Sequence, residues 1–287
     1  MNFQILRNME GFTRDMFNRI IGFQEKEHAA WDKTADFAER IKGLPLHYLV
    51  FSNADRDPET HGPTVAHYYP LRKEMLAIAH YAAQVADKPV VVDAHGRNGF
   101  IGSLLARELP QGQVVGLRDP KEKPNQIENF MDENCYRQQP GTLAGYDGPA
   151  DVVFSSWMPS CSDISDDINR LKPKLVVYVY TEHTHPETAE PQTGLGSSFG
   201  DRLSADYQLI DEWQVIRSQD MFHEVWPDLT GNIEEVRLVR IYSNQPLEQL
   251  PLPSPTEVYD WEEELLMAET ALTAKREMMR SGFPAFA

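Results

Sequence analysis

The chain is poor in cysteine and in positive charge, and each shortage excludes a class of protein. Only two cysteines, Cys135 and Cys161, occur among 287 residues, and their spacing fits no metal motif, so no disulfide scaffold organises the fold. Lys and Arg number 27 against 44 Asp and Glu, for a formal net charge of −17. The basic residues are scattered, and an acidic surface repels nucleic acid and anionic lipid. We therefore expect a small-molecule or protein substrate as partner, no nucleic acid and no membrane.

The N-terminal stretch lacks the long apolar run of a secretory signal or a membrane span. MNFQILRNMEGFTRDMF carries charges every few residues. Together with the scarcity of cysteine, this predicts a cytoplasmic protein. No internal repeat or low-complexity tract is visible, and a hydrophobic content of 41% is ample for a large core.

Apolar residues at helical spacing predict a helical extension ahead of an α/β core. Three amphipathic helices are expected, around residues 5–20, 31–44 and 71–85. The stretch SNADRDPETHGP, residues 52–63, has the composition of a loop. Residues 1–89 are therefore predicted to form an N-terminal helical extension or cap.

Residues 90–243 alternate between short β-branched runs and helical stretches, as βαβ units do. Buried strands are predicted at residues 90–92, 114–117, 150–156 and 174–181, and an alternating strand at residues 236–243. Weaker strand signals lie around residues 135–143 and 207–216, and helices are expected at residues 100–109 and 124–134 and, as a short crossover, between residues 151 and 175. This order predicts an α/β fold with a doubly wound, mostly parallel sheet.

The C-terminal segment, residues 244–287, is predicted to be a linker followed by one helix. NQPLEQLPLPSP is stiffened by proline, and Ser254 and Glu257 form a capping box at the start of the helix. Apolar residues then recur every seven positions, at Val258, Leu265, Leu272 and Met279. Such a helix either packs on its own domain or forms a homodimer contact.

The most informative stretch is VVVDAHGRNGFIG, residues 90–102, which combines a buried strand, a glycine turn and the start of a helix. In open α/β sheets, ligands bind beyond the carboxyl ends of the strands, near the point where the strand order reverses. Glycines let the backbone approach a ligand closely, and a helix N-terminus supplies free N–H donors. The stretch therefore predicts a ligand site at this turn.

Two families share features with this turn. DAHGRNGFIG, continuing to VVGL, resembles the nucleotide-binding turn of extended short-chain dehydrogenases. The same segment resembles the first motif of class I S-adenosylmethionine-dependent methyltransferases, D-x-G-x-G-x-G, with His95 and Arg97 at two glycine positions. The dehydrogenases also need a Tyr-x-x-x-Lys pair, and no tyrosine after residue 95 has a lysine four positions on. ADVVFSSWMPS and NRLKPKLVVYVYTE resemble later methyltransferase motifs, so residues 71–243 resemble that family as a whole.

The methyltransferase resemblance implies a seven-stranded sheet with an antiparallel last strand, and methyl transfer from S-adenosylmethionine to a small molecule or a protein side chain. It places residues of four loops around the donor, namely Asp93, His95, Gly96, Gly99, Arg118, Asp119 and Ser155. Trp157 and Met158 would meet the substrate, and Glu182 or His183 would act as catalytic base. Arg118 stands where the family usually has an acid, and Asp119 is one residue late.

Two other readings stay open, and the metal prediction is negative. The chain could instead be an NAD(P)-binding protein of the short-chain dehydrogenase type. It could also be a methyltransferase-like scaffold whose donor pocket has decayed. His183 and His185 share one side of an extended segment, but two histidines alone predict no metal site.

Overall fold

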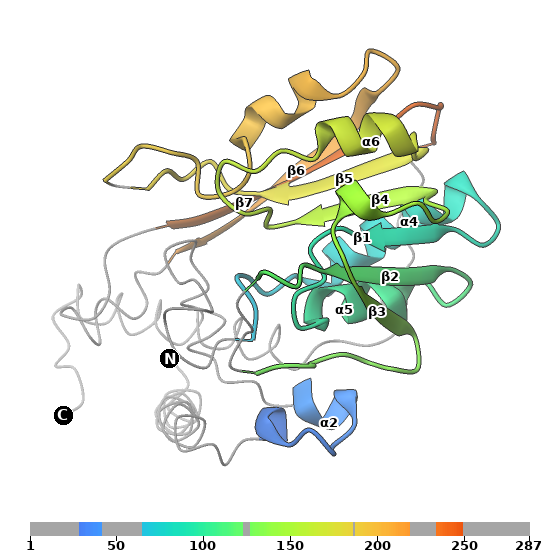
Figure 1. Cartoon of the computed structure of the whole chain (residues 1–287), viewed down its shortest axis with the longest axis vertical. Coiled ribbons are helices and arrows are strands. Elements are labelled where there is room, and N and C mark those ends of the chain that lie inside the picture. The colour runs from blue at the N-terminus through green and yellow to red at the C-terminus, as the bar shows by residue number, and fades with distance from the viewer. Residues whose placement is uncertain (1–28, 42–64, 123–126, 186, 219–233, 249–287) are drawn as a thin grey trace, which may run out of the picture. The chain divides into compact units, whose positions relative to one another are not determined.

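The computed structural model describes residues 29–41, 65–122, 127–185, 187–218 and 234–248 (Figure 1). The chain divides into two compact units, one made of Met1–Ser52, Arg217–Glu234 and Glu257–Ala287, the other of Asn53–Ile216 and Glu235–Thr256. The predicted helices around residues 5–20 and after Ser254, and the loop at residues 52–63, lie outside the described residues. The three-part division of the chain at residues 89 and 243 stays a prediction.

In the first unit, the described residues form two short helical pieces where one longer helix was predicted. These are η1 (Ala29–Trp31) and α2 (Phe37–Ile41). Between them, Asp32 Oδ1 accepts hydrogen bonds from the Thr34 N–H and the Thr34 hydroxyl, which competes with helical pairing of the backbone. Asp36 then caps α2, because its Oδ1 accepts the Glu39 N–H at 2.8 Å.

The second unit is built on a seven-stranded sheet with the strand order β3-β2-β1-β4-β5-β7-β6 (Figure 1). Neighbouring strands from β3 to β5 pair in parallel, and β7 pairs antiparallel with β5. The predicted fold class is confirmed: a doubly wound, mostly parallel α/β sheet with an antiparallel last strand. The strands are β1 (Val90–Asp93), β2 (Gln113–Arg118), β3 (Tyr136–Pro140), β4 (Val152–Ser156), β5 (Leu175–Tyr180), β6 (Gln208–Ser218) and β7 (Glu234–Ser243).

Helices cover both faces of this sheet. Figure 1 shows α4 (Arg72–Val85) and α5 (Phe100–Glu108) on one face, and α6 (Ser165–Leu171) on the other. Shorter 3-10 turns are η2 (Leu143–Gly145) and η3 (Gly196–Arg202). None of the helices in the described ranges is both long enough and apolar enough to cross a bilayer, and α4, with 14 residues, is the longest of them.

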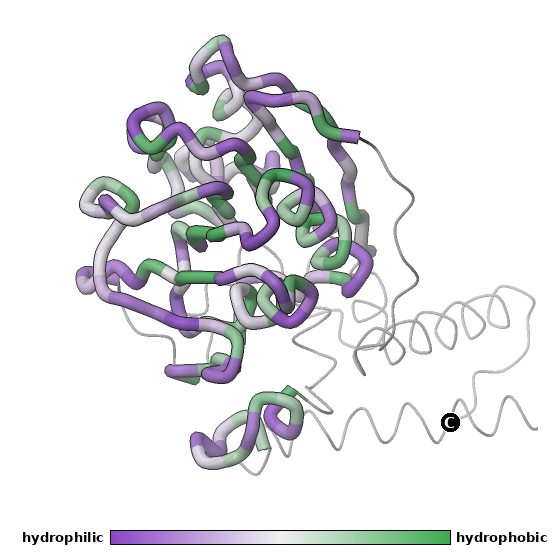
Figure 2. The backbone as a smooth tube through the Cα atoms, turned by 90° about the vertical axis from the view of Figure 1, so that its right-hand side faces the viewer, coloured by the Kyte–Doolittle hydropathy of each residue, from purple (hydrophilic) through white to green (hydrophobic). Residues whose placement is uncertain are grey.

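The core follows from the strand sequences. All residues of β4 and β5 are buried, as expected for parallel strands that are covered on both faces. On the α6 face, side chains of five strands pack with Ile168 and Phe199 into one cluster. Stretches of hydrophobic residues alternate with stretches of hydrophilic residues along the described chain (Figure 2), as segments pass between interior and surface.

The predicted helix over residues 124–134 is wrong for the part that is described, residues 127–134. This segment is irregular, and Asn129 adopts a left-handed conformation with φ of 51°. Its backbone groups bind side chains of the core instead of a helical ladder: the Ile127 carbonyl accepts from Asn98 Nδ2, and the Asp132 N–H donates to Ser103 Oγ. Tertiary hydrogen bonds therefore override the local helix propensity.

A buried ion pair that sequence patterns did not reveal ties α4 to β7. Glu74 and Arg237 are 3% and 0% exposed, and Arg237 Nε lies 3.2 Å from Glu74 Oε1. The Arg237 guanidinium also lies 4.8 Å from the centre of the Tyr68 ring, in a cation–π contact. Tyr68 precedes α4, so the same pair fixes the segment that leads to the carboxyl edge of the sheet.

We expect Glu74→Gln to lower the free energy of unfolding by roughly 3–5 kcal/mol, because it removes one charge of a buried ion pair. The measurement is urea unfolding followed by tryptophan fluorescence. Glu212→Gln is the matched control, since Glu212 and its partner Arg240 are 55% and 24% exposed, and it should cost less than about 1 kcal/mol. Equal, small losses in both variants would contradict the expectation.

Candidate functional site

The loops after β1 and β4 meet at the point where the strand order reverses. In the sheet, β2 and β3 lie on one side of β1, and β4 and β5 lie on its other side. Open α/β sheets bind ligands at this point, beyond the carboxyl ends of the strands. The glycine turn, residues 94–99, and the loop that starts at Trp157 therefore form the candidate site.

The glycines of the turn are required by close packing. Gly99 has φ of 89°, and a Cβ there would lie 2.5 Å from Met131 Cβ. A Cβ at Gly96 would lie 2.8 Å from the Tyr136 hydroxyl oxygen. The Gly96 N–H donates to the Leu117 carbonyl at 2.8 Å, which holds the turn against the end of β2. Packing alone thus explains both glycines, and their contact with a donor stays a prediction.

Asp93, the last residue of β1, is buried and holds the glycine turn in place. Its Oδ2 accepts a hydrogen bond from the Tyr136 hydroxyl at 2.9 Å, and its Oδ1 accepts the His95 N–H at 3.3 Å. Burial raises the pKa of Asp93 to about 6, although the Tyr136 hydrogen bond acts in the opposite direction. The described contacts give Asp93 a structural role. Tyr136 is a site residue that the sequence patterns missed.

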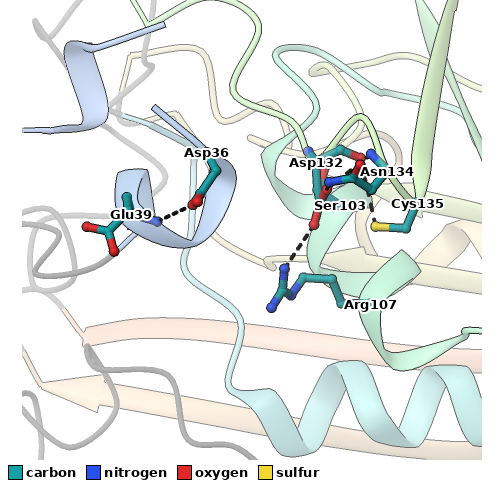
Figure 3. A network of polar contacts seen from close by, with 7 residues as sticks. All are labelled: Asp36, Glu39, Ser103, Arg107, Asp132, Asn134 and Cys135. Atoms are coloured by element: carbon teal, nitrogen blue, oxygen red, sulfur yellow. Dashed lines mark hydrogen bonds and ion pairs between the residues drawn. The ribbon is translucent and has the colours of Figure 1, made fainter. Parts of the chain in front are cut away.

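A polar network around Asp132 places Tyr136 at the turn (Figure 3). Asp132 Oδ2 pairs with Arg107 of α5 at 2.9 Å, and its Oδ1 accepts the Asn134 side-chain amide at 3.0 Å. The Asp132 N–H donates to Ser103 Oγ at 2.8 Å. These contacts join α5 to the residues that enter β3, so the first residue of β3, Tyr136, lies under the turn from which α5 starts.

His95 connects the turn to β4. Its Nε2 lies 3.2 Å from Ser155 Oγ, and Ser155 is fully buried. Burial, followed by the nearby Arg97 charge, lowers the pKa of His95 to about 3. The imidazole is therefore neutral near neutral pH and serves as a hydrogen-bonding group.

Arg97 connects the turn to three other strands or loops. Its Nη2 donates to the Trp157 carbonyl at 2.9 Å, and its Nη1 lies 2.8 Å from Glu122 Oε1. The Arg97 carbonyl accepts a hydrogen bond from Gln138 Nε2 in β3 at 2.8 Å. Arg97 has φ of 44°, an uncommon conformation for a residue with a side chain.

Trp157 is the second non-glycine residue of the site with a left-handed backbone, with φ of 54°. Its buried ring lies 5.2 Å from the Tyr68 ring and 6.3 Å from the His67 ring, between centroids. The Tyr68 hydroxyl is 2.9 Å from Ser156 Oγ. Burial, followed by the nearby Arg97 charge, lowers the pKa of His67 well below its usual value. Such backbone strain clusters at functional sites, which supports this location.

The other predicted donor and substrate residues have local partners. Asp119 Oδ1 accepts the Lys121 N–H at 2.8 Å and so closes its own turn after β2. Arg118 Nη1 lies 3.4 Å from Asn129 Oδ1. Met158 is fully buried, and its side chain lies against Gly194. Their predicted contacts with donor and substrate stay predictions.

Glu182 and His183 follow the end of β5. Glu182 is exposed, and the His183 N–H donates to Thr181 Oγ1 at 3.2 Å. The His183 carbonyl accepts the Gln192 N–H at 3.0 Å, so His183 helps to hold its own loop. Within the described ranges, no group of three or more His, Cys, Asp or Glu residues could hold a metal ion.

Comparisons with known proteins give only distant likenesses. No family model and no curated protein matches the chain. Among solved structures it is similar to the YcgJ protein from Bacillus subtilis, at 15% identity over 59% of this chain and 97% of that one, with a TM-score of 0.40. TehB from Haemophilus influenzae matches at 10% identity over 66% and 68%, with a TM-score of 0.43. Coclaurine N-methyltransferase bound to N-methylheliamine and SAH matches at 10% identity over 84% and 94%, with a TM-score of 0.39.

We expect the stability of the protein to depend on pH through Asp93. Its folded-state pKa of about 6 exceeds the ordinary value of 3.8, so the folded state holds the proton more tightly than the unfolded state does. The resulting stability is present below about pH 4 and is lost as the pH rises through about 6, by up to about 3 kcal/mol.

The measurement is the free energy of unfolding in urea across this pH range, for the wild type and for Asp93→Asn. The difference between the two proteins should fall as the pH rises, because the neutral amide does not titrate. A difference that stays constant with pH would contradict the assignment.

Proposed function

We propose that this chain binds S-adenosylmethionine at the carboxyl edge of the sheet and transfers its methyl group to a small molecule or a protein side chain. The observation that carries the proposal is the position of the antiparallel strand β7, between β5 and β6. The dinucleotide-binding fold has the order 3-2-1-4-5-6, with no strand inserted at this place. Together with the missing Tyr-x-x-x-Lys pair, the sheet order disfavours the dehydrogenase reading.

The residues at the point where the strand order reverses suit an adenosine-bearing donor in part. An acid, Asp119, follows β2 and is partly exposed, and a carboxylate there can accept hydrogen bonds from ribose hydroxyls. Tyr68, Trp157 and Met158 supply a buried apolar wall beside β4 that excludes water. His95 and Arg97 stand at two glycine positions of the motif, and their side chains reduce the space left for the donor between these residues.

S-adenosylmethionine supplies a methyl group on a sulfonium, so the protein mainly has to align the acceptor and exclude water. An acceptor that must lose a proton also needs a base. His95 is unsuited to that task, because a pKa of about 3 makes it a weak base near neutral pH. We assign the base to Glu182 or His183, after β5, where the acceptor side of the site would begin.

A scaffold without catalytic activity is the second candidate, favoured by one specific observation. His95 contacts Ser155 and Arg97 contacts the Trp157 carbonyl, so two side chains of the turn bridge the loops between which a donor would lie. Under either reading we propose a cytoplasmic protein with a small-molecule or protein partner and no affinity for nucleic acid or membranes. The proposed homodimer contact, the C-terminal helix, lies outside the described residues.

We expect S-adenosylhomocysteine to bind the full-length protein, and NADH and NADPH not to bind. Isothermal titration with each of the three ligands is the measurement. Binding of a nicotinamide nucleotide would favour the dehydrogenase reading. If none of the three ligands binds, the result favours the scaffold whose donor pocket has decayed.

We expect Asp119→Asn to weaken S-adenosylhomocysteine binding by roughly tenfold or more, the loss typical of a hydrogen bond to a charged group. The amide keeps an oxygen that can accept the Lys121 N–H, so the turn itself should stay closed. Asp147→Asn is the control, because the Asp147 side chain is 92% exposed at another loop. Unchanged affinity in Asp119→Asn would remove Asp119 from the donor site.

A further inference from the structure

The Arg97 side chain spans the ligand-binding point of the sheet. Its guanidinium reaches the Trp157 carbonyl, after β4, with one terminal nitrogen, and Glu122, after β2, with the other. Arg97 itself belongs to the loop after β1. These three loops surround the place where open α/β sheets bind their ligands. One guanidinium therefore links the loops after β1, β2 and β4, between which a donor would bind.

We propose that Arg97 is a latch: its ion pair with Glu122 and its hydrogen bond to the Trp157 carbonyl hold the donor crevice closed. The donor binds only when the guanidinium has left this position. The inference rests on the proposed function, because it assumes that the crevice is a donor site. It also explains how a chain with arginine at a glycine position of the motif can still bind a donor.

The contacts of Arg97 are of a strength that a ligand can overcome. The Arg97 and Glu122 side chains are 22% and 20% exposed, so solvent and salt weaken their attraction. Arg97 Nε is buried with no hydrogen-bond partner among the described residues, which penalises the closed position. The backbone of Arg97, with φ of 44°, adds a conformational cost that is independent of the side chain.

The latch has a measurable consequence for affinity. When the binding-competent state is a fraction of the population, the apparent dissociation constant is the intrinsic constant divided by that fraction. Opening the latch by mutation should therefore tighten binding, whereas removing a residue that contacts the donor should weaken it. The direction of the change separates the two roles.

The experiment is isothermal titration of the full-length protein with S-adenosylhomocysteine. Arg97→Ala and Glu122→Gln should each bind about fivefold more tightly than the wild type, as expected for an ion pair of this exposure. The double variant should gain little beyond either single variant, because both changes break the same pair. Alanine keeps the backbone cost of φ at residue 97, so the comparison isolates the side chain.

Salt and a matched arginine supply the controls. Raising NaCl from about 50 mM to about 500 mM should tighten binding to the wild type and leave Arg97→Ala unchanged, since salt screens the pair. Arg240→Ala removes a partly exposed ion pair, with Glu212, that lies outside the candidate site, and it should not tighten binding. Circular dichroism of each variant establishes that it is folded, and Glu122→Gln tests the latch if Arg97→Ala is not.

The outcomes separate this inference from the proposed function. If the wild type binds and folded Arg97→Ala or Glu122→Gln binds equally or more weakly, the latch is overturned and the donor site stands. If tightening occurs only in Arg97→Ala, bulk and not the ion pair closes the crevice, and the latch as stated is overturned. If neither the wild type nor the folded variants bind, the proposed function fails, and the latch fails with it.

Discussion

A buried hydrogen bond between Tyr136 and Asp93 is the constraint on which the candidate site depends. The tyrosine ring lies against the backbone at Gly96, Gly99, Gly102 and Gly116, where any Cβ would collide with it or leave too little space. Its hydroxyl reaches the carboxylate at the end of β1. The glycine spacing is thus first a packing requirement between a strand, a turn and a tyrosine that comes from β3. The position of the turn above the sheet, and of the residues it carries, follows from this packing.

The turn carries two side chains at positions where the motif that it resembles has glycine, and both contact residues in or directly after β4. His95 is neutral because burial disfavours its charged form, and the Arg97 guanidinium forms an ion pair with Glu122. Two left-handed residues, Arg97 and Trp157, meet through one hydrogen bond. Strain of this kind persists only when the surroundings hold it, and here the Tyr68, Arg237 and Glu74 contacts stabilise the Trp157 side.

Several elements could be predicted because their signal is local. Each of three patterns predicts its element without knowledge of the rest of the chain: the β-branched runs of β4 and β5, the helical spacing of α4 and the alternation in β7. The helix predicted at residues 124–134 is wrong over the described part because backbone groups of this segment form hydrogen bonds with side chains of α5 and the turn. Local spacing carries no information about such partners. For the same reason the glycine turn was found, whereas His67, Glu122 and Tyr136 were missed.

The sequence by itself determined the class of fold and the place of the turn, since burial on a strand or helix imposes a period that can be read along the chain. Only the tertiary structure decided which side chains meet at that turn. Arg97 reaches the Trp157 carbonyl across sixty positions of chain, and Glu74 pairs with Arg237 across more than half of its length. These contacts depend on strand order, because neighbours in the sheet are β1 and β4, and β5 and β7, and no short stretch of sequence encodes that order.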